Sequence, residues 1–298
     1  MLSILTSTFN SSRHIEFFLN NIKKQADKLN VSYEIIIVDD GSKDNTLEIL
    51  KEIIPVIKNL KIIELSNNFG QIAAIFCGLK LCSGKEIFIT DSDIEENEDN
   101  LIRFYEEFKK DNSLDMVYGV VSKKEGYGFL NSLSSQIFNK LIYSLTNKEI
   151  PKNQSWTRII SHKLSMELLK FKEIESYPAG VFSLVGFKQK KLDINKKFKG
   201  YSSYNLSKKI KLALNICTNF SSLPLVAICV FGLIVSLISF LFVLIIFFAK
   251  IFIGFSSGWA SLIIFIGFIG GVNILSIGIV GIYISKIFTQ VKNRPAYI

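Results

Sequence analysis

The stretch Ile87-Phe88-Ile89-Thr90-Asp91-Ser92-Asp93-Ile94-Glu95-Glu96 decides the fold that this sequence predicts. A short apolar run that ends in a cluster of acids is typical of a buried β-strand ending in a polar site. Asp91 and Asp93 are two positions apart, so an extended backbone directs both side chains to one face. Two such carboxylates repel each other unless a hard divalent cation with oxygen ligands binds there. The stretch therefore predicts a site for Mg²⁺ or Mn²⁺.

The residues before that stretch alternate between strand and helix patterns. Four apolar, β-rich segments are expected strands, namely Met1–Thr8, Tyr33–Val38, Leu60–Leu65 and Glu86–Thr90. Helical spacing of apolar residues follows the first three, beginning at Ile15, Leu47 and Gln71. This order predicts an open α/β sheet with right-handed crossovers, whose ligands bind beyond the carboxyl ends of the strands.

Polar clusters follow three of these strands at the end where ligands are expected. They are Phe9-Asn10, Asp39-Asp40 and the segment 91–93. The two acidic clusters have an alternative interpretation, because Asp39-Asp40-Gly41-Ser42 is typical of a turn anywhere in a protein and acidic surface turns are common. The agreement among three strand ends favours one shared site, in which a carboxylate can accept a hydrogen bond from a ribose hydroxyl or a base N–H.

Composition separates a globular part from an apolar part. Of the 298 residues, 49% are hydrophobic, and this excess lies almost wholly after Ser222. The net charge is +9, with lysines concentrated between Lys188 and Lys211. A basic segment that ends where an apolar one begins favours anionic lipid headgroups or a phosphorylated ligand. Nucleic acid is not an expected partner, because the chain carries no recognition motif for it.

The apolar part predicts a membrane anchor. Residues 223–249 and 260–284 are long and uncharged enough for two transmembrane helices. Residues 206–222 are expected to form a juxtamembrane amphipathic helix, and residues 285–298 a cytoplasmic tail. The lysines lie outside the two spans, with only Lys250 between them, so both termini should be cytoplasmic at a bacterial inner membrane.

Two features of the helices leave alternatives open. Gly267 and Gly271 form a Gly-x-x-x-Gly motif, which permits close packing either within one helix hairpin or in a homo-oligomer. Apolar residues between 131 and 145 fall near helical spacing, and that segment is either an ordinary core-facing helix or a helix in the membrane interface.

Motifs along nearly the whole chain occur in the same order as those of a known family. The motifs are Thr8-Phe9-Asn10, Val38-Asp39-Asp40-Gly41-Ser42, Asn68-Phe69-Gly70-Gln71, Asp91-Ser92-Asp93-Ile94-Glu95, Arg158, Gly200-Tyr201-Ser202-Ser203-Tyr204 and Val291–Ile298. With them the chain resembles the family 2 inverting glycosyltransferases of the GT-A fold, which is Rossmann-like and binds nucleotide diphosphosugars. Within that family it is similar to the polyprenyl-phosphate sugar synthases, bacterial relatives of dolichyl-phosphate mannose synthase. The resemblance implies that residues 1–205 form a cytoplasmic GT-A domain.

The resemblance also implies a role for each matching residue. The implied substrate-binding residues are Thr8, Phe9, Asn10, Asp39, Asp40, Gly70, Gln71, Lys199, Ser202 and Tyr204, with Asp39 and Asp40 on the nucleoside. The implied catalytic residues are Asp91, Asp93 and Arg158, and the implied ligands of Mg²⁺ or Mn²⁺ are Asp91, Asp93 and Glu95. Asp91 and Asp93 would contact the ribose and the metal-bound diphosphate.

The chain departs from the family pattern at several positions. Ser7 and Ser11 replace a proline and a glutamate, Asn67 an arginine, Glu95 a glutamine, and Trp156-Thr157-Arg158 an Asp-Phe-Arg segment. The acid of that segment is therefore missing. A sugar hydroxyl needs a general base, whereas a lipid phosphate, with a second pKa of about 6, is already anionic at neutral pH. The missing acid favours a phosphate acceptor.

These features predict an inverting, metal-dependent enzyme that moves a sugar from a nucleotide diphosphosugar, expected to be a UDP-sugar, to undecaprenyl phosphate. Arg158 and lysines of residues 196–211 would hold the lipid phosphate. One alternative is a glycosyltransferase that adds its sugar to a hydroxyl of a lipid-linked oligosaccharide in cell-surface polysaccharide synthesis. Another is a non-catalytic membrane partner of a lipid-sugar flippase.

Overall fold

The computed structural model describes residues 1–92, 99–125, 154–171, 182, 185–197, 223–252, 258–292 and 295–298. The chain divides into two compact units, one formed by residues 1–213 with 294–298 and the other by residues 214–293. Several predictions fall outside the described residues. They concern Asp93, Glu95, Lys199, Ser202, Tyr204, the segment 131–145 and the amphipathic helix 206–222.

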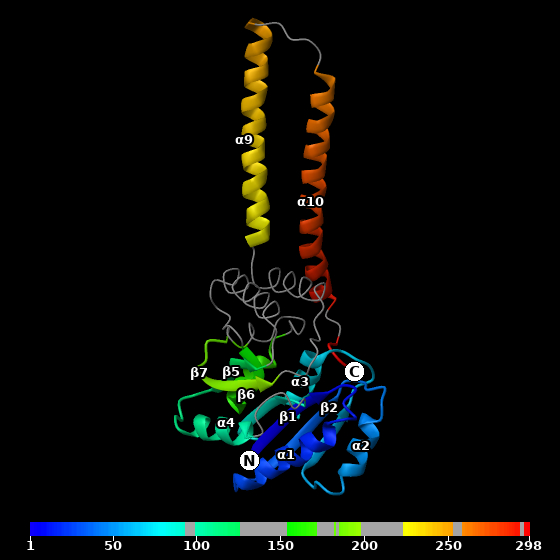
Figure 1. The fold of residues 1–298 in the computed structure, drawn as a ribbon, viewed down its shortest axis with the longest axis vertical. Helices are drawn as coiled ribbons and strands as arrows, with labels where there is room; N and C mark the ends of the chain where they lie inside the picture. Colours follow the sequence, from blue (N-terminus) through cyan, green and yellow to red (C-terminus); the bar gives the residue numbers. More distant parts are fainter. Residues whose placement is uncertain are drawn as a thin grey trace. The chain divides into compact units, whose positions relative to one another are not determined.

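A seven-stranded mixed sheet forms the centre of the first unit (Figure 1). Its strands are β1 (Leu2–Thr8), β2 (Tyr33–Asp39), β3 (Leu60–Glu64), β4 (Glu86–Asp91), β5 (Met116–Glu125), β6 (Gln154–Ser161) and β7 (Gln189–Lys197). They lie in the order β3-β2-β1-β4-β6-β5-β7. The first four are mutually parallel, β6 is antiparallel to β4 and β5, and β7 is parallel to β5. The four expected strands are confirmed, and the fold is GT-A-like.

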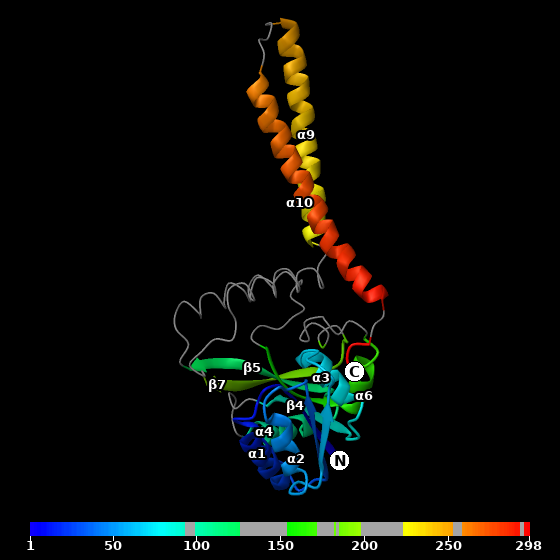
Figure 2. The same cartoon turned by 90° about the vertical axis from the view of Figure 1, so that its right-hand side faces the viewer.

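Helices cover both faces of this sheet. The helices α1 (Ile15–Lys28), α2 (Thr46–Ile53) and α4 (Asn100–Lys109) share one core with alternate residues of the strands. In that core, the rings of Phe88 and Phe104 meet edge to face at 5.8 Å. The helices α3 (Gln71–Leu79) and α6 (His162–Leu168) contact strands of the sheet as well (Figure 2). Gly78 of α3 lies directly against Leu5 and Val38, whose side chains point away from the first core.

Strand register brings the polar strand ends together. Thr8 at the end of β1 pairs with Asp39 at the end of β2, and Ser7 pairs with Asp91 at the end of β4. Because β6 runs antiparallel to β4, the beginning of β6 lies at this same edge, with Arg158 paired to Ile89. The edge therefore collects residues from sequence positions 7 to 158, as the strand pattern predicted for the ends of β1, β2 and β4.

The last residues of the sequence belong to the first unit. The Ser66 amide, just after β3, donates a hydrogen bond to the backbone oxygen of Ile298 at 2.9 Å. The Lys80 ammonium lies 5.0 Å from the centre of the Tyr297 ring. These contacts attach residues 295–298 to the end of α3 and to the start of the loop that connects β3 to α3, here called the β3–α3 loop (residues 66–70).

The second unit consists of the helices α9 (Leu223–Phe252) and α10 (Trp259–Val291) among its described residues. The two predicted apolar helices are therefore present as helices, and α10 continues past Ile284 into the segment that was expected to be tail. By length and composition, the described residues contain one candidate membrane span, Phe268–Val291, while the apolar part of α9, Leu225–Val235, is shorter. Two transmembrane helices are not confirmed, and the multi-pass topology stays a prediction.

Candidate functional site

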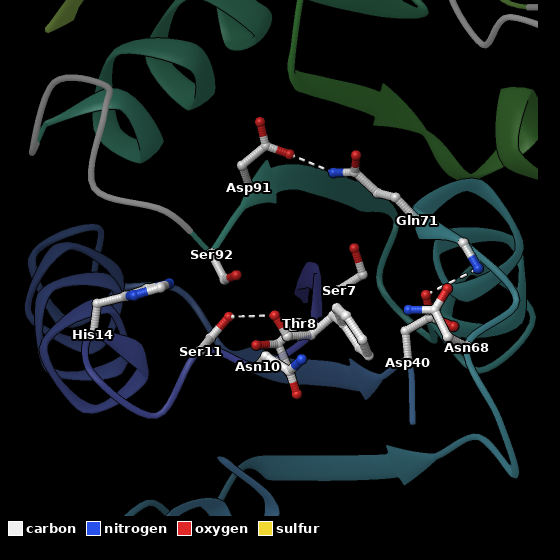
Figure 3. A pocket seen from close by; sticks show the side chains of 12 residues that line it. Ser7, Thr8, Asn10, Ser11, His14, Asp40, Asn68, Gln71, Asp91 and Ser92 are labelled. Atoms are coloured by element: carbon white, nitrogen blue, oxygen red, sulfur yellow. Dashed lines mark hydrogen bonds between the residues drawn. The ribbon is translucent and has the colours of Figure 1, made fainter. Parts of the chain in front are cut away.

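A pocket of about 450 Å³ opens at the carboxyl edge of the sheet (Figure 3). Small-molecule sites typically measure about 300–1,000 Å³. The lining residues are Ser7, Thr8, Phe9, Asn10, Ser11, His14, Asp40, Asn68, Gly70, Gln71, Asp91 and Ser92. They come from the ends of β1, β2 and β4 and from the starts of α1 and α3. Seven residues that the sequence implied as a site thus share one cavity: Thr8, Phe9, Asn10, Asp40, Gly70, Gln71 and Asp91.

Asp40 anchors the β3–α3 loop. Its Oδ1 accepts a hydrogen bond from the Phe69 amide at 2.8 Å, and its Oδ2 accepts one from the Gly70 amide at 2.9 Å. Burial raises the pKa of Asp40 above its ordinary value, although the two backbone N–H groups oppose the shift. Both carboxylate oxygens are therefore engaged inside the protein, and the predicted contact of Asp40 with a nucleoside stays untested.

Asp39 is buried and orders the turn that follows β2. Its Oδ2 accepts a hydrogen bond from the Ser42 amide at 3.0 Å, and its Oδ1 accepts one from the Ser42 hydroxyl at 2.5 Å. Unlike Asp40, Asp39 is not among the described residues that line the pocket. Both of these hydrogen bonds to Asp39 thus come from Ser42, and its predicted contact with a nucleoside stays untested.

Hydrogen bonds join the loop after β1 to the loop after β2. Asn10 has a positive φ of 50°, and its Oδ1 accepts a hydrogen bond from the Lys43 amide at 2.8 Å. The Ser12 amide donates to Asp44 Oδ2 at 3.2 Å, and the Ser11 amide donates to Thr46 Oγ1 at 2.8 Å. Side chains of the second loop therefore satisfy amides of the first, which gives this wall of the pocket a defined shape.

Asp44 makes the stability of this wall depend on pH. Burial acts to raise its pKa, but hydrogen bonds from Thr46 and Ser12 outweigh burial and lower the pKa from 3.8 to about 2. Because the pKa is lower in the folded protein, the stabilising contribution is complete above pH 3.8 and is lost as the pH falls towards 2. We expect the difference in melting temperature between wild type and Asp44→Asn to shrink across that window. A difference that stays constant from neutral pH to pH 2 would contradict this role of Asp44.

Asp91 is the carboxylate that faces the pocket at the end of β4. Gln71 at the start of α3 donates a hydrogen bond from Nε2 to Asp91 Oδ1 at 2.5 Å, and Figure 3 shows the two side chains directed toward each other. Ser7 and Ser92 line the same pocket. Oxygen donors of this kind suit Mg²⁺ and Mn²⁺, which often use one or two carboxylates together with phosphate oxygens. The described residues contain no cluster of three or more acidic, His or Cys ligands.

Thr8 contributes a buried hydroxyl to the pocket. The residue is 3% exposed, and within the described part of the chain its Oγ1 has no hydrogen-bond partner. An unpaired hydroxyl in a buried position costs about 1–3 kcal/mol. A ligand in the pocket that supplies a partner to Thr8 removes this cost, which agrees with the implied role of Thr8 in substrate binding.

Arg158 is a buried cation on β6 and is not among the described pocket residues. It is 2% exposed, and it donates hydrogen bonds from Nε to the carbonyl of Trp156 and from Nη2 to the carbonyl of Ser155, both at 2.9 Å. Its guanidinium lies 4.1 Å from the centre of the Phe182 ring. These contacts hold the charge rigidly within the domain, and its predicted catalytic role stays untested.

Five lining residues were not among the predicted site residues: Ser7, Ser11, His14, Asn68 and Ser92. Four of them stand within or directly beside the quoted motifs, so their neighbours were a usable signal. His14 had no such signal, because its position depends on where α1 begins relative to the ends of β1 and β4.

Comparisons with known proteins agree with this architecture. The sequence profile described as Glycosyl transferase family 2 matches residues 3–169. An uncharacterized glycosyltransferase of Bacillus subtilis, YkcC, is 31% identical over 99% of this chain and 92% of its own length. The SfII prophage-derived bactoprenol glucosyl transferase of Shigella flexneri is 29% identical over 100% of this chain and 96% of its own length.

A solved structure is similar as well. The crystal structure of S. aureus TarS 1–349 has 20% sequence identity and a TM-score of 0.48, covering 73% of this chain and 70% of that one. The family profile covers more than half of the sequence, including every described residue of the pocket. The chain belongs to glycosyl transferase family 2.

Proposed function

We propose that this glycosyltransferase transfers one sugar from a nucleotide diphosphosugar to a polyprenyl phosphate, with inversion at the anomeric carbon. The observation that carries the proposal is the pocket at the carboxyl edge, where the Asp91 carboxylate is held by Gln71. The acceptor follows from similarity over the whole chain to proteins named bactoprenol glucosyl transferase. A candidate membrane span at Phe268–Val291 supports an acceptor that resides in a membrane.

In this proposal the pocket binds the nucleotide end of the donor. Thr8 supplies a hydroxyl that has no partner among the described residues, and the β3–α3 loop, anchored on Asp40, supplies the wall on which the nucleoside would rest. The β1–α1 and β2–α2 loops, joined through Asp44, form the opposite wall. Because these contacts exist without ligand, the loops lose little conformational entropy when the nucleotide binds, which favours affinity.

The transfer itself is a single displacement. A phosphate oxygen of the lipid attacks the anomeric carbon, a new carbon–oxygen bond forms, and the bond to the diphosphate breaks on the opposite side. The nucleoside diphosphate leaves with the bonding electron pair. The acceptor is already anionic at neutral pH, so the reaction needs no general base, in accord with the acid that is missing at Trp156.

A divalent cation fits the oxygen chemistry at Asp91. Asp91 would hold it, together with Asp93 and Glu95, which lie outside the described residues. Such a cation, Mg²⁺ or Mn²⁺, supplies positive charge that stabilises the departing diphosphate. The described lining of the pocket contains no Lys or Arg, so the cation accounts for charge that these residues do not provide.

The location of the reaction also belongs to this proposal. We place the first unit and both termini on the cytoplasmic side of a bacterial inner membrane, with α9 and α10 as two spans. The basic residues outside the apolar helices support this orientation, because cytoplasmic flanks carry an excess of Lys and Arg. The enzyme would then meet nucleotide sugars in the cytoplasm and the lipid phosphate in the inner leaflet.

The test uses membranes that contain the full chain. They are incubated with undecaprenyl phosphate, Mn²⁺ and a panel of radiolabelled nucleotide sugars, and the lipid products are separated by thin-layer chromatography. We expect one donor to yield a lipid that carries a single sugar, and expect Asp93→Ala to yield none. If only lipid-linked oligosaccharide becomes labelled, the hydroxyl-acceptor alternative replaces this proposal. If no nucleotide binds with or without Mn²⁺, both enzymatic functions are wrong.

A further inference from the structure

We propose that one face of β6 forms the binding site for the sugar ring of the donor, and that Gln154 and Trp156 determine which sugar is accepted. This inference rests on the proposed function, because it concerns the sugar attached to the nucleotide. Gln154, Trp156 and Arg158 alternate along the strand and are here called the β6 row. Alternate residues of a strand point to the same face of the sheet.

Two contacts hold Trp156 and Arg158 of the β6 row together. The Arg158 guanidinium lies 5.5 Å from the centre of the Trp156 ring. Arg158 Nε also donates to the carbonyl of Trp156 at 2.9 Å. Because Arg158 is itself packed against Phe182, the cation fixes both the backbone and the ring of Trp156. The indole is therefore presented in a defined position before any ligand binds.

Strand register brings the start of β6 to the edge of the sheet where β4 ends. Ile89 of β4 pairs with Arg158, and the next pair is marked by a contact of 3.3 Å between the hydroxyls of Thr90 and Thr157. Asp91 is the residue of β4 after Thr90, and Trp156 is the residue of β6 before Thr157. The indole therefore stands at the edge of the sheet that also carries Asp91, the carboxylate that we assign to the diphosphate end of the donor.

Gln154 provides the polar half of the site. Both of its amide atoms, Oε1 and Nε2, are buried, and neither has a hydrogen-bond partner in the part of the chain that the structure describes. Native proteins rarely keep buried amides unpaired, and each case calls for an explanation such as a ligand. An amide both donates and accepts hydrogen bonds, as does a sugar hydroxyl. A hydroxyl of the donor sugar would satisfy both atoms at once.

The indole of Trp156 provides the apolar half. The C–H groups on one face of a sugar ring carry partial positive charge, and the face of an aromatic ring carries partial negative charge. A ring packed on Trp156 with a hydroxyl at Gln154 would lie next to Asp91, where the bond to the diphosphate breaks. The indole of Trp156 and the amide of Gln154 would together select the sugar by its apolar face and its hydroxyl.

Fluorescence offers a direct test, because the chain contains only two tryptophans, Trp156 and Trp259. In the full-length Trp259→Phe variant, Trp156 is the single indole. The variant in detergent with Mn²⁺ is titrated with UDP, UDP-glucose, UDP-galactose and UDP-N-acetylglucosamine. We expect the sugar nucleotide that labels lipid to change the emission, and UDP alone to change it little. An equal change with UDP and with that donor would overturn the proposal.

Replacement of Gln154 gives a second test, in which sugar preference is expected to fall while thermal stability does not. Gln154→Leu removes a buried amide that has no partner among the described residues, so we expect an equal or higher melting temperature. We also expect the preference for the correct nucleotide sugar over UDP to fall about tenfold, because a site built around a hydrogen-bonded hydroxyl loses its discrimination. Affinity for UDP itself should stay unchanged.

Gln189→Leu is the matched control. The Gln189 amide on β7 does have a partner, since Nε2 donates to the carbonyl of Phe182 at 2.7 Å. We expect this variant to melt at a lower temperature and to keep its sugar preference. If wild type labels lipid and Gln154→Leu keeps the wild-type preference, the sugar site is wrong and the proposed function survives. If wild type labels no lipid with any donor, the proposed function fails and takes the sugar site with it.

Discussion

Replacing Asp91 by Asn is expected to lower transfer of sugar to lipid by about 10²–10³-fold, the loss typical when a group that stabilises transition-state charge is removed. Asp91 lines the pocket, whereas both oxygens of Asp40, the other carboxylate of the described lining, accept hydrogen bonds from backbone amides. The substituted asparagine keeps a carbonyl oxygen for the Gln71 amide, so the fold should be retained. The measurement is the initial rate of lipid labelling.

Gln71→Ala serves as the control for Asp91→Asn. It removes the hydrogen bond to Asp91 and leaves the carboxylate in place, so we expect a loss of about tenfold or less. The two variants together separate the charge of Asp91 from its orientation. If Asp91→Asn transfers sugar within about tenfold of the wild-type rate, Asp91 does not act on the diphosphate and the centre of the site must lie elsewhere.

Gly41→Ala is expected to have the second large effect, on both stability and nucleotide affinity. Gly41 has a φ of +69°, and a Cβ atom there would lie 2.6 Å from the carbonyl carbon of Asn67 and 2.9 Å from the Asn68 amide nitrogen. Both neighbours are backbone, so no side-chain rotation relieves the clash. The β3–α3 loop must move away from Asp40, which weakens the hydrogen bonds that anchor it.

Gly186→Ala isolates the contribution of backbone strain. Gly186 has nearly the same φ, +68°, but a Cβ atom there meets nothing within 4 Å. A positive φ costs an L-residue about 1–2 kcal/mol. In a domain of this size each kcal/mol lowers the melting temperature by about 2–4 °C. We expect Gly186→Ala to lose a few degrees and to bind UDP normally.

The comparison of the two glycine variants is the measurement. Gly41→Ala should melt at least about 5 °C below Gly186→Ala and bind UDP about tenfold more weakly, since it adds a backbone clash of a kind that reaches several kcal/mol. Equal melting temperatures for the two variants would show that the β3–α3 loop moves away from position 41 without loss of stability. The support that Asp40 gives to the pocket would then be minor.

The alternation of short apolar runs with amphipathic helices was sufficient to predict β1 to β4 and the helices between them. The prediction that polar residues at the strand ends share one site was reliable for a physical reason. The carboxyl ends of parallel strands meet at one edge, so residues such as Thr8 and Asp91 come together whatever the details of packing. The strands β5, β6 and β7 were not predicted, because β6 inserts between β4 and β5 and such long-range pairing has no local pattern.

The sequence by itself determined the strand and helix order of the first half, the acidic strand ends, the apolar helices of the second unit and membership of the family. Only the tertiary structure decided what each acid binds. Asp39 is paired with Ser42 and Asp40 with the amides of residues 69 and 70, while Asp91 faces the pocket. The reason is that periodicity records which face of an element is buried, whereas hydrogen-bond partners depend on where loops from separate strands meet.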